Sequence, residues 1–233
     1  MGATFLTAEW RWLAMLNYRI DPSVLQSLVP AGTELDSWRG ETMVSVVGFR
    51  FLNTRLLGLP IPFHRNFDEV NLRFYVRREV AGKVRRGVVF VREVVPRIAI
   101  ATVARWTYNE PYQACPMRSE QGPGGARYEW RQGGRWNSLK VDVAGEPQPL
   151  VASSEAEFIT EHYWGYTRQR DGGTVEYEVR HPPWRVWSAQ SARLKCDVRG
   201  FYGQPFVEAL TAEPCSAFLA EGSAVEVLSA RRI

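Results

Sequence analysis

The sequence of 233 residues is poor in cysteine and histidine, with three of each. The cysteines are scattered and form no C-x-x-C pair, so they provide no disulfide framework, and a reduced, cytoplasmic setting is expected. The histidines form no H-x-H or H-E-x-x-H cluster, which argues against a metal site. We therefore expect the protein to need neither a metal nor another cofactor.

Motifs of several functional classes are also absent. The sequence has no G-x-S-x-G nucleophile turn and no glycine-rich phosphate loop leading from a strand into a helix. It has no run of five basic residues and no zinc-finger spacing, so nucleic acid is not an expected partner. The apolar segment 1–13 carries Glu9 and Arg11, which argues against a signal peptide or a membrane span. These absences predict a soluble protein without a membrane partner.

Lysine is rare as well, and the net charge of +4 therefore depends on arginine. The lysines are Lys83, Lys140 and Lys195. Arginine binds carboxylates and phosphates through a planar pair of hydrogen bonds that lysine cannot make. The bias fits a solvated, arginine-rich surface or a dedicated anion-binding surface, and both interpretations stay open.

β-Strand patterns are abundant, and 45% hydrophobic and 12% aromatic residues provide material for a core. Apolar and polar side chains alternate over residues 70–77, which is typical of a half-buried strand. Segments rich in apolar and β-branched residues predict further core strands at 42–51, 87–93, 98–107 and 224–229.

Turn and helix signals complete the fold prediction. Gly133-Gly134 and Gly172-Gly173 each separate two strand patterns and predict hairpins. Asp21-Pro22 predicts a short helix, and Ser154-Glu-Ala-Glu157 is a capping box that opens another. Many strands, few helices and no βαβ rhythm predict a mostly β fold, an antiparallel barrel or sandwich that forms a single domain over 1–233.

Ionisable residues gather in two of the predicted strand regions. Arg73 lies on the same face as Glu69 in the alternating segment, while Arg105 and Tyr108 closely precede Glu110. A buried carboxylate beside an arginine can hold a substrate acid or poise a proton. A purely structural salt-bridge ladder between strands is the alternative. The nine tryptophans likewise fit a packed core or an aromatic-lined cavity.

Short motifs give the chain a resemblance to a known family. Asn66-Phe-Asp-Glu-Val70 and Trp106-Thr-Tyr-Asn-Glu-Pro-Tyr-Gln-Ala114 resemble two motifs of the acetoacetate decarboxylase superfamily. Glu161-His-Tyr-Trp-Gly-Tyr166, followed by His181-Pro-Pro-Trp184, is similar to its YqjF-like branch of uncharacterised bacterial proteins. The resemblance implies a cone-shaped antiparallel β-barrel with an interior small-molecule pocket, often assembled into homo-oligomers.

The chain departs from that family at the reactive amine. The resemblance implies a Pro-Lys-Lys step whose first lysine forms a Schiff base with a β-keto acid. Here Tyr112 and Gln113 follow the proline, and neither side chain can form an imine. Glu69 is the family carboxylate that the resemblance carries over to this chain.

Three functions stay open at this stage. The first is an acid–base enzyme on an organic acid or carbonyl compound, with Glu69 or Glu110 moving the proton and Tyr112 donating a hydrogen bond. The predicted substrate contacts of that enzyme are Arg73, Arg105, Tyr108 and Gln113. The second is a non-catalytic barrel that binds or senses a small ligand. The third is a decarboxylase with a displaced lysine.

Overall fold

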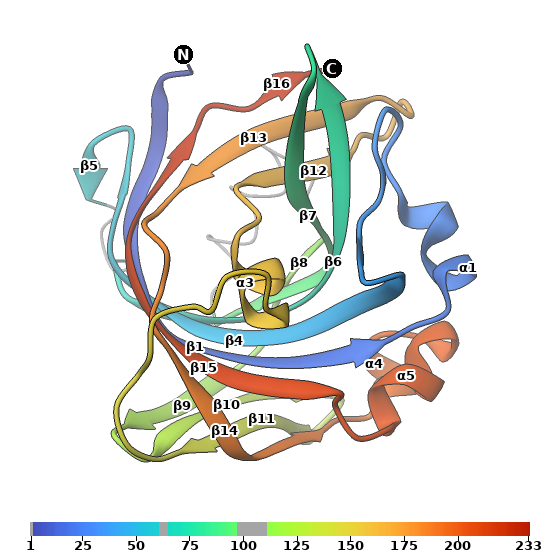
Figure 1. Cartoon of the computed structure of the whole chain (residues 1–233). Coiled ribbons are helices and arrows are strands. Elements are labelled where there is room, and N and C mark those ends of the chain that lie inside the picture. Colours follow the sequence, from blue (N-terminus) through green and yellow to red (C-terminus); the bar gives the residue numbers. More distant parts are fainter. Residues whose placement is uncertain (1, 61–64, 97–110) are drawn as a thin grey trace.

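The computed structural model describes residues 2–60, 65–96 and 111–233, which form mainly long, curved strands. The longest strands bend round a common centre (Figure 1). They are β1 (Thr4–Arg19), β4 (Glu41–Leu56), β6 (Phe67–Val80), β7 (Lys83–Val95) and β15 (Ser216–Leu228). The mostly β fold predicted from the sequence is confirmed.

Seven of the described strands pair into a closed ring, in the order β13–β12–β7–β6–β4–β1–β15. β12 (Trp164–Arg168) and β13 (Thr174–Arg180) form a hairpin, and β13 closes the ring through Val179 opposite Val227 on β15. Neighbouring strands are antiparallel except β12 and β7, which run parallel. Closure pairs the edges that an open sheet would expose.

A second group of strands leaves the ring at β15 and packs against its outside. Its order is β14 (Val186–Lys195), β11 (Arg135–Val143), β10 (Gly125–Gln132) and β9 (Met117–Gly122). The contact with the ring is close: a Cβ added to Gly48 of β4 would lie 2.6 Å from a ring carbon of Tyr128 on β10. The Tyr128 hydroxyl also donates to the carbonyl of Trp12 on β1, at 2.8 Å.

Strand alternation divides the core into two apolar clusters, one on each face of the ring. The outer cluster, between the ring and the second group of strands, includes Leu72, Phe74 and Tyr128. The inner cluster, inside the ring, includes Met15, Phe49, Tyr75 and Phe158. The alternation predicted for residues 70–77 is confirmed, since Leu72 and Phe74 face outward and Tyr75 faces inward.

Three neighbouring strands each contain a backbone irregularity, a local bend in the strand. Trp12 of β1, Asn53 of β4 and Gly222 of β15 all have positive φ, at 58°, 54° and 79°. A β-bulge changes which side chains face inward and increases the local twist. A side chain at Gly222 is excluded because its Cβ would lie 2.0 Å from the Trp10 carbonyl oxygen.

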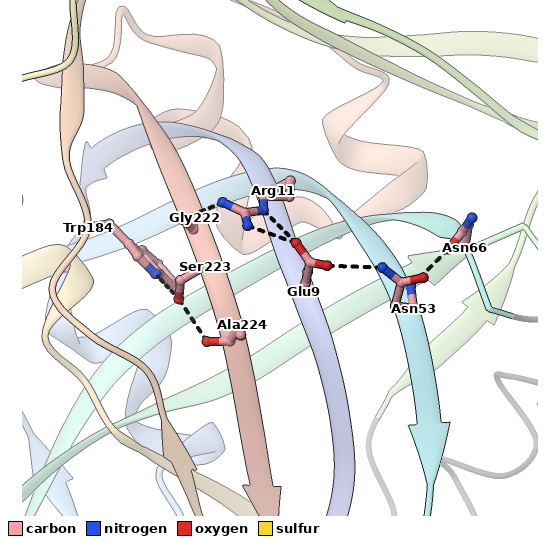
Figure 2. A network of polar contacts seen from close by, with 8 residues as sticks. All are labelled: Glu9, Arg11, Asn53, Asn66, Trp184, Gly222, Ser223 and Ala224. Carbon is pink, nitrogen blue, oxygen red and sulfur yellow. Dashed lines mark hydrogen bonds and ion pairs between the residues drawn. The ribbon is translucent and has the colours of Figure 1, made fainter. Parts of the chain in front are cut away.

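A polar network ties these bends together on the outer surface (Figure 2). Arg11 donates to Glu9 through Nη2 at 2.7 Å and to the carbonyl of Gly222 through Nη1 at 3.2 Å. Asn53 Nδ2 donates to the other oxygen of Glu9 at 2.9 Å. Glu9 therefore links β1 to β4 while Arg11 links β1 to β15, where the ring must curve.

One short helix, α3 (Glu155–Thr160), lies within the ring (Figure 1). Ser154 caps it by accepting from the backbone N–H of Glu157, and the carboxylate of Glu157 accepts from the N–H of Ser153. The capping box predicted at 154–157 is thus confirmed, with the return bond one residue earlier than in the standard pattern. Phe158 and Ile159 bury this helix in the inner cluster.

The remaining described elements are short and are not among the seven strands of the ring. They are α1 (Pro22–Leu25), η1 (Gln26–Leu28), α4 (Val198–Phe201), η2 (Gln204–Phe206), α5 (Val207–Thr211), β2 (Glu34–Leu35), β3 (Ser37–Trp38), β5 (Leu59–Pro60), β8 (Tyr112–Ala114) and β16 (Arg231–Arg232). No helix in the described ranges has the length and apolar character needed to cross a membrane.

The two predicted hairpins and the helix after Asp21 are confirmed. The predicted strand at 98–107 lies outside the described residues. The last predicted strand, 224–229, is the end of a longer strand, since β15 already begins at Ser216. Its apolar period is interrupted by the bend at Gly222, which hid its first half from the sequence pattern.

Candidate functional site

Polar side chains interrupt the apolar interior along β6. Glu69, Asn71, Arg73 and Tyr75 occupy alternate positions of this strand and share its inward face. Glu69 and Asn71 are each only 2% exposed. Burying a carboxyl, an amide and a guanidinium together is costly unless they bind one another or a ligand, so this face is the candidate site.

Glu69 is held by two neutral donors. Asn71 Nδ2 donates to Oε1 at 3.0 Å, and the Tyr112 hydroxyl donates to Oε2 at 3.1 Å. Burial, the largest influence, raises the pKa of Glu69 to about 7, although both hydrogen bonds and the charge of Arg73 act to lower it. A carboxyl group with a pKa near neutrality can both accept and donate a proton under ordinary conditions.

Tyr112 reaches Glu69 from β8, a three-residue strand that runs parallel to the end of β7. It lies beside Glu93 of β7, which is in turn directly opposite Asn71 of β6. Glu93 is 1% exposed. The site thus contains a second buried acidic residue, which sequence reasoning did not single out. Its place follows from the pairing of Glu93 with Asn71, which a register shift hides from the sequence pattern.

Arg73 is directed into the ring by α3. Its Nη2 donates to the carbonyl of Ile159 at 3.2 Å and lies 3.8 Å from the sulfur of Met15. Its Nε is buried and has no hydrogen-bond partner among the described residues. The same holds for Oδ1 of Asn71, two residues away on the same face. A donor and an acceptor are therefore left for a bound molecule or for water.

A chain of hydrogen bonds crosses the inner face beyond Arg73. The Tyr75 hydroxyl and Ser45 Oγ lie 2.6 Å apart, and Ser45 Oγ donates to Asn17 Oδ1 at 2.6 Å. Asn17 Nδ2 donates to Ser216 Oγ at 2.9 Å, and Ser216 in turn donates to Glu155 at the start of α3. These residues come from four different strands and one helix, so the chain anchors α3 inside the ring.

His162 closes the other end of α3. It is packed between the rings of Tyr75 and Phe158, and its Nε2 lies 3.4 Å from Asp36 Oδ2. Burial lowers the pKa of His162 to about 4, so its imidazole is neutral near pH 7. Burial acts to raise the pKa of Asp36, but contacts with His162 and Arg86 outweigh it and lower that pKa to about 2.

The structure brings together three of the residues predicted for the site, namely Glu69, Tyr112 and Arg73. Gln113 lies apart from them, because successive residues of a strand point to opposite faces. Its side-chain oxygen accepts instead from Arg92 Nη1, at 2.5 Å. The other predicted site residues, Glu110, Arg105 and Tyr108, lie outside the described residues and stay predictions.

All three lysines lie on the exterior. Lys83 is exposed at the start of β7, Lys140 pairs with Asp142 on an exposed surface at 2.8 Å, and Lys195 is exposed at the end of β14. Within residues 2–60, 65–96 and 111–233, no group of three or more His, Cys, Asp or Glu side chains is arranged to hold a metal ion. The inner site therefore offers carboxyl, phenol, amide and guanidinium groups.

Comparison with solved structures places this architecture among acetoacetate decarboxylase-like folds. Acetoacetate decarboxylase from Legionella pneumophila superposes with a TM-score of 0.69 at 14% identity, over 99% of this chain and 88% of that one. The enduracididine biosynthesis enzyme MppR, solved with pyruvate, gives 0.68 at 15% identity, over 100% and 91% of the two chains. At such identities the likeness concerns the fold alone.

Sequence comparison gives a narrower relationship. The uncharacterized protein YqjF of Bacillus subtilis (strain 168) is 29% identical over 198 residues, which are 82% of this chain and 78% of that protein. The sequence profile of DUF2071, a family of uncharacterized conserved proteins, matches residues 7–224. The match includes residues of every strand of the ring and every described residue of the inner site. The chain belongs to the DUF2071 family.

Proposed function

We propose that the protein is an acid–base enzyme that acts on a small organic acid or carbonyl compound inside the ring. The observation that carries this proposal is Glu69, a fully enclosed carboxyl group with a pKa of about 7 and a hydrogen bond from Tyr112. Purely structural carboxylates are usually saturated by charged partners, whereas Glu69 has two neutral donors and only the more distant charge of Arg73.

The neighbouring groups support an acidic ligand. Arg73 offers a buried Nε–H with no partner among the described residues, and a guanidinium binds a carboxylate through such parallel donors. Asn71 lies between Arg73 and Glu69 on the same strand face. A short keto acid bound by its carboxylate at Arg73 would extend along β6 toward Glu69 and Tyr112.

The proposed step is transfer of a proton at the carbon next to a carbonyl group. Ionised Glu69 takes the proton, the C–H bonding pair moves into the carbonyl, and an enolate forms. The single hydrogen of the Tyr112 hydroxyl, which binds ionised Glu69, turns to the new negative charge on the substrate oxygen once Glu69 holds the proton. Return of the proton from Glu69 to the same or another carbon completes the cycle, and no imine is involved.

Two fold neighbours support the choice of ligand class. One is an acetoacetate decarboxylase by name, and another was solved with pyruvate. Acetoacetate and pyruvate are both small keto acids. The exterior positions of Lys83, Lys140 and Lys195 favour chemistry without a Schiff base over a decarboxylase with a displaced lysine. Borohydride trapping with acetoacetate should accordingly leave the mass of the protein unchanged.

The direct test is hydrogen exchange at carbon. The full-length protein is incubated with pyruvate or acetoacetate in deuterated water, and loss of the C–H signal is followed by NMR. We expect exchange above the uncatalysed rate, reduced at least about a hundredfold in Glu69→Gln because proton transfer typically contributes that much. Glu178→Gln is the matched control, since Glu178 pairs with Arg180 on the outer surface.

A non-catalytic binding barrel is the second candidate, supported by the unpartnered buried atoms on Asn71 and Arg73. Calorimetry with the same two keto acids separates the candidates. Binding that is weakened by Arg73→Gln, without any carbon exchange, would favour the binding barrel. If neither acid binds nor exchanges, both versions of the inner site are wrong for this ligand class.

A further inference from the structure

The second group of strands, β9, β10, β11 and β14, has one face against the ring and one face turned away from it (Figure 1). On the side toward the ring, Leu139 and Val141 belong to the outer apolar cluster. Because side chains alternate along a strand, their neighbours line the opposite side, which we call the outer sheet face. Its members are Arg118, Glu120, Arg127, Glu129, Arg131, Trp136, Ser138, Lys140, Asp142, Ser191, Arg193 and Lys195.

Positive charge prevails on the outer sheet face. Six of its twelve side chains are arginine or lysine, and three are acidic. The surplus is three positive charges, whereas the net charge of all 233 residues is +4. Most of the net charge of the protein therefore lies on one face of four strands.

Three of the cations are held by carboxylates of the same face. Glu129 accepts from both Arg118 and Arg127, at 2.6 and 2.7 Å, and Asp142 pairs with Lys140 at 2.8 Å. Because two arginines share Glu129, these two carboxylates balance all but one of the three positive charges.

Arg193 and Lys195 of β14 differ from these paired cations. Both are exposed, and neither makes a hydrogen bond or an ion pair with a described residue. Arg193 is directly opposite Lys140, which is itself opposite Arg127, so three cations form a row across β14, β11 and β10. Like charges directly opposite each other destabilise a sheet. The fold gains nothing from this row, which indicates an anionic partner outside the chain.

An exposed tryptophan lies at one end of the outer sheet face, beside the turn between β10 and β11. Trp136 is 36% exposed, with Arg131 directly opposite it. The guanidinium carbon of Arg118 lies 4.3 Å from the centroid of the Trp136 ring. Tryptophan is enriched where proteins meet the membrane–water interface, because its amphipathic ring suits the level of the lipid headgroups.

We propose that the outer sheet face docks on the anionic surface of a lipid membrane without crossing it. The cations are spread over four neighbouring strands, about 14 Å across, so they match a two-dimensional array of charges better than a single line of phosphates. Apart from Trp136 the face has no large apolar side chain, whereas a protein partner would need an apolar centre to the interface. A lipid surface requires only the charge and the interfacial ring.

The local sequence does not show this face. Outward cations alternate with inward apolar residues, as in Arg193-Leu-Lys195, so no basic run appears. The sequence-based expectation of no membrane partner depended on the lack of a spanning segment, and peripheral docking needs none. Strand pairing is what gathers the cations.

Vesicle sedimentation of the full-length protein tests the proposal. Wild type should bind vesicles of equal parts phosphatidylserine and phosphatidylcholine at least about tenfold more tightly than vesicles of phosphatidylcholine alone. The double variant Arg193→Glu, Lys195→Glu should lose at least about tenfold of that binding. The new carboxylate opposite Lys140 should not harm folding, which the thermal midpoint checks. The milder pair Arg193→Gln, Lys195→Gln should lose less.

A matched control carries the same change in charge elsewhere. Lys83 at the start of β7 and Arg170 in the β12–β13 turn are exposed, and Figure 1 shows both turns away from β9, β10, β11 and β14. Lys83→Glu, Arg170→Glu should bind anionic vesicles within about twofold of wild type, because salt screens distant charges. Glu69→Gln should also bind normally, so failure of the inner site would leave this test intact.

Three results would overturn the proposal. The first is equal binding of wild type to both kinds of vesicle. The second is equal loss in the two charge-reversed double variants, because net charge rather than this face would then decide binding. The third is binding to poly(U) RNA without binding to anionic vesicles, which would make nucleic acid the occupant of the face.

Discussion

Glu69 and Glu176 are both buried side chains on strands of the ring, with 2% and 0% of their surface exposed, yet their partners differ in kind. Glu176 receives short contacts from three guanidinium groups, including Arg85 Nη1 at 2.6 Å and Arg78 Nη1 at 2.9 Å. Glu69 receives one amide and one phenol. The first carboxylate is saturated by positive charge, and the second is not.

The difference separates a structural role from a chemical one. Glu176 joins the β6–β7 hairpin to β13 and, through Arg231, to the C-terminal strand β16. The charges of three cationic partners stabilise the carboxylate of Glu176 and hold it between these strands, which is a structural role. The surroundings of Glu69 give its charged form less stabilisation, and burial raises its pKa to about 7. Substitution of Glu176 should therefore mainly lower stability, whereas substitution of Glu69 should mainly impair proton transfer.

The largest effect on stability is expected from Glu176→Gln. It leaves three arginines facing one another without a carboxylate, and loss of one partner of a buried ion pair typically costs about 3–5 kcal/mol. We expect the free energy of unfolding, measured in urea, to fall by about 3 kcal/mol. This is the lower end of the range, because the three guanidinium groups are 22–58% exposed and keep contact with water. Glu178→Gln, which disrupts an exposed pair, should change stability by less than about 1 kcal/mol.

Equal stabilities of these two variants would show that burial does not decide the strength of the arginine cluster. Keto acid exchange, which depends on the inner site, should survive in both variants under conditions where they are folded. Loss of exchange in a folded Glu176→Gln protein would instead show that the role of Glu176 is not structural alone.

Glu69→Gln should change how stability depends on pH. The folded-state pKa of Glu69, about 7, lies above its ordinary value of 4.5, so the folded protein binds more protons between these values. The contribution of Glu69 to stability is therefore present at low pH and is lost as pH rises to about 7. From pH 5 to pH 8 the variant should gain about 2 kcal/mol relative to wild type.

Only the difference between the two proteins isolates this effect. His162, whose pKa is lowered to about 4, gives stability the opposite slope as pH rises from about 4 toward 6.5. It is present in both proteins and cancels in the comparison. Urea unfolding at pH 5 and pH 8 supplies the measurement, and a difference that stays constant with pH would contradict a raised pKa at Glu69.

How far the sequence predicts this site depends on the regularity of each strand. The period of two in residues 70–77 runs through the middle of β6, which itself has no extra residue, so continuing it back to Glu69 correctly placed Glu69 and Arg73 on one face. β7 is different, because the register shifts between Leu72 and Arg73 and leaves an extra residue on β7. The inward position of Glu93 could not be read through that shift.

Other parts of the site depend on contacts between distant segments. β8 has three residues, too few to show any period, so the opposite directions of Tyr112 and Gln113 were not visible in the sequence. β1 was not predicted as a strand because the bend at Trp12 interrupts its alternation. The hydrogen bond between Asn17 and Ser216 joins residues 199 positions apart. Short sequence patterns cannot predict such a pairing, because it depends on how distant strands come together.

Tyr112→Phe should give the smallest but most specific change. It removes one of the two donors that stabilise the ionised form of Glu69, so the pKa of Glu69 should rise further above its ordinary value. Stability at pH 8 should fall by about 1 kcal/mol, the usual worth of one hydrogen bond, and less at pH 5, where Glu69 is mostly protonated. NMR titration of a ¹³C-labelled glutamate carboxyl measures the shift directly. Because the phenyl ring keeps its packing in the inner cluster, an unchanged or lowered pKa would mean that Tyr112 does not govern the proton on Glu69.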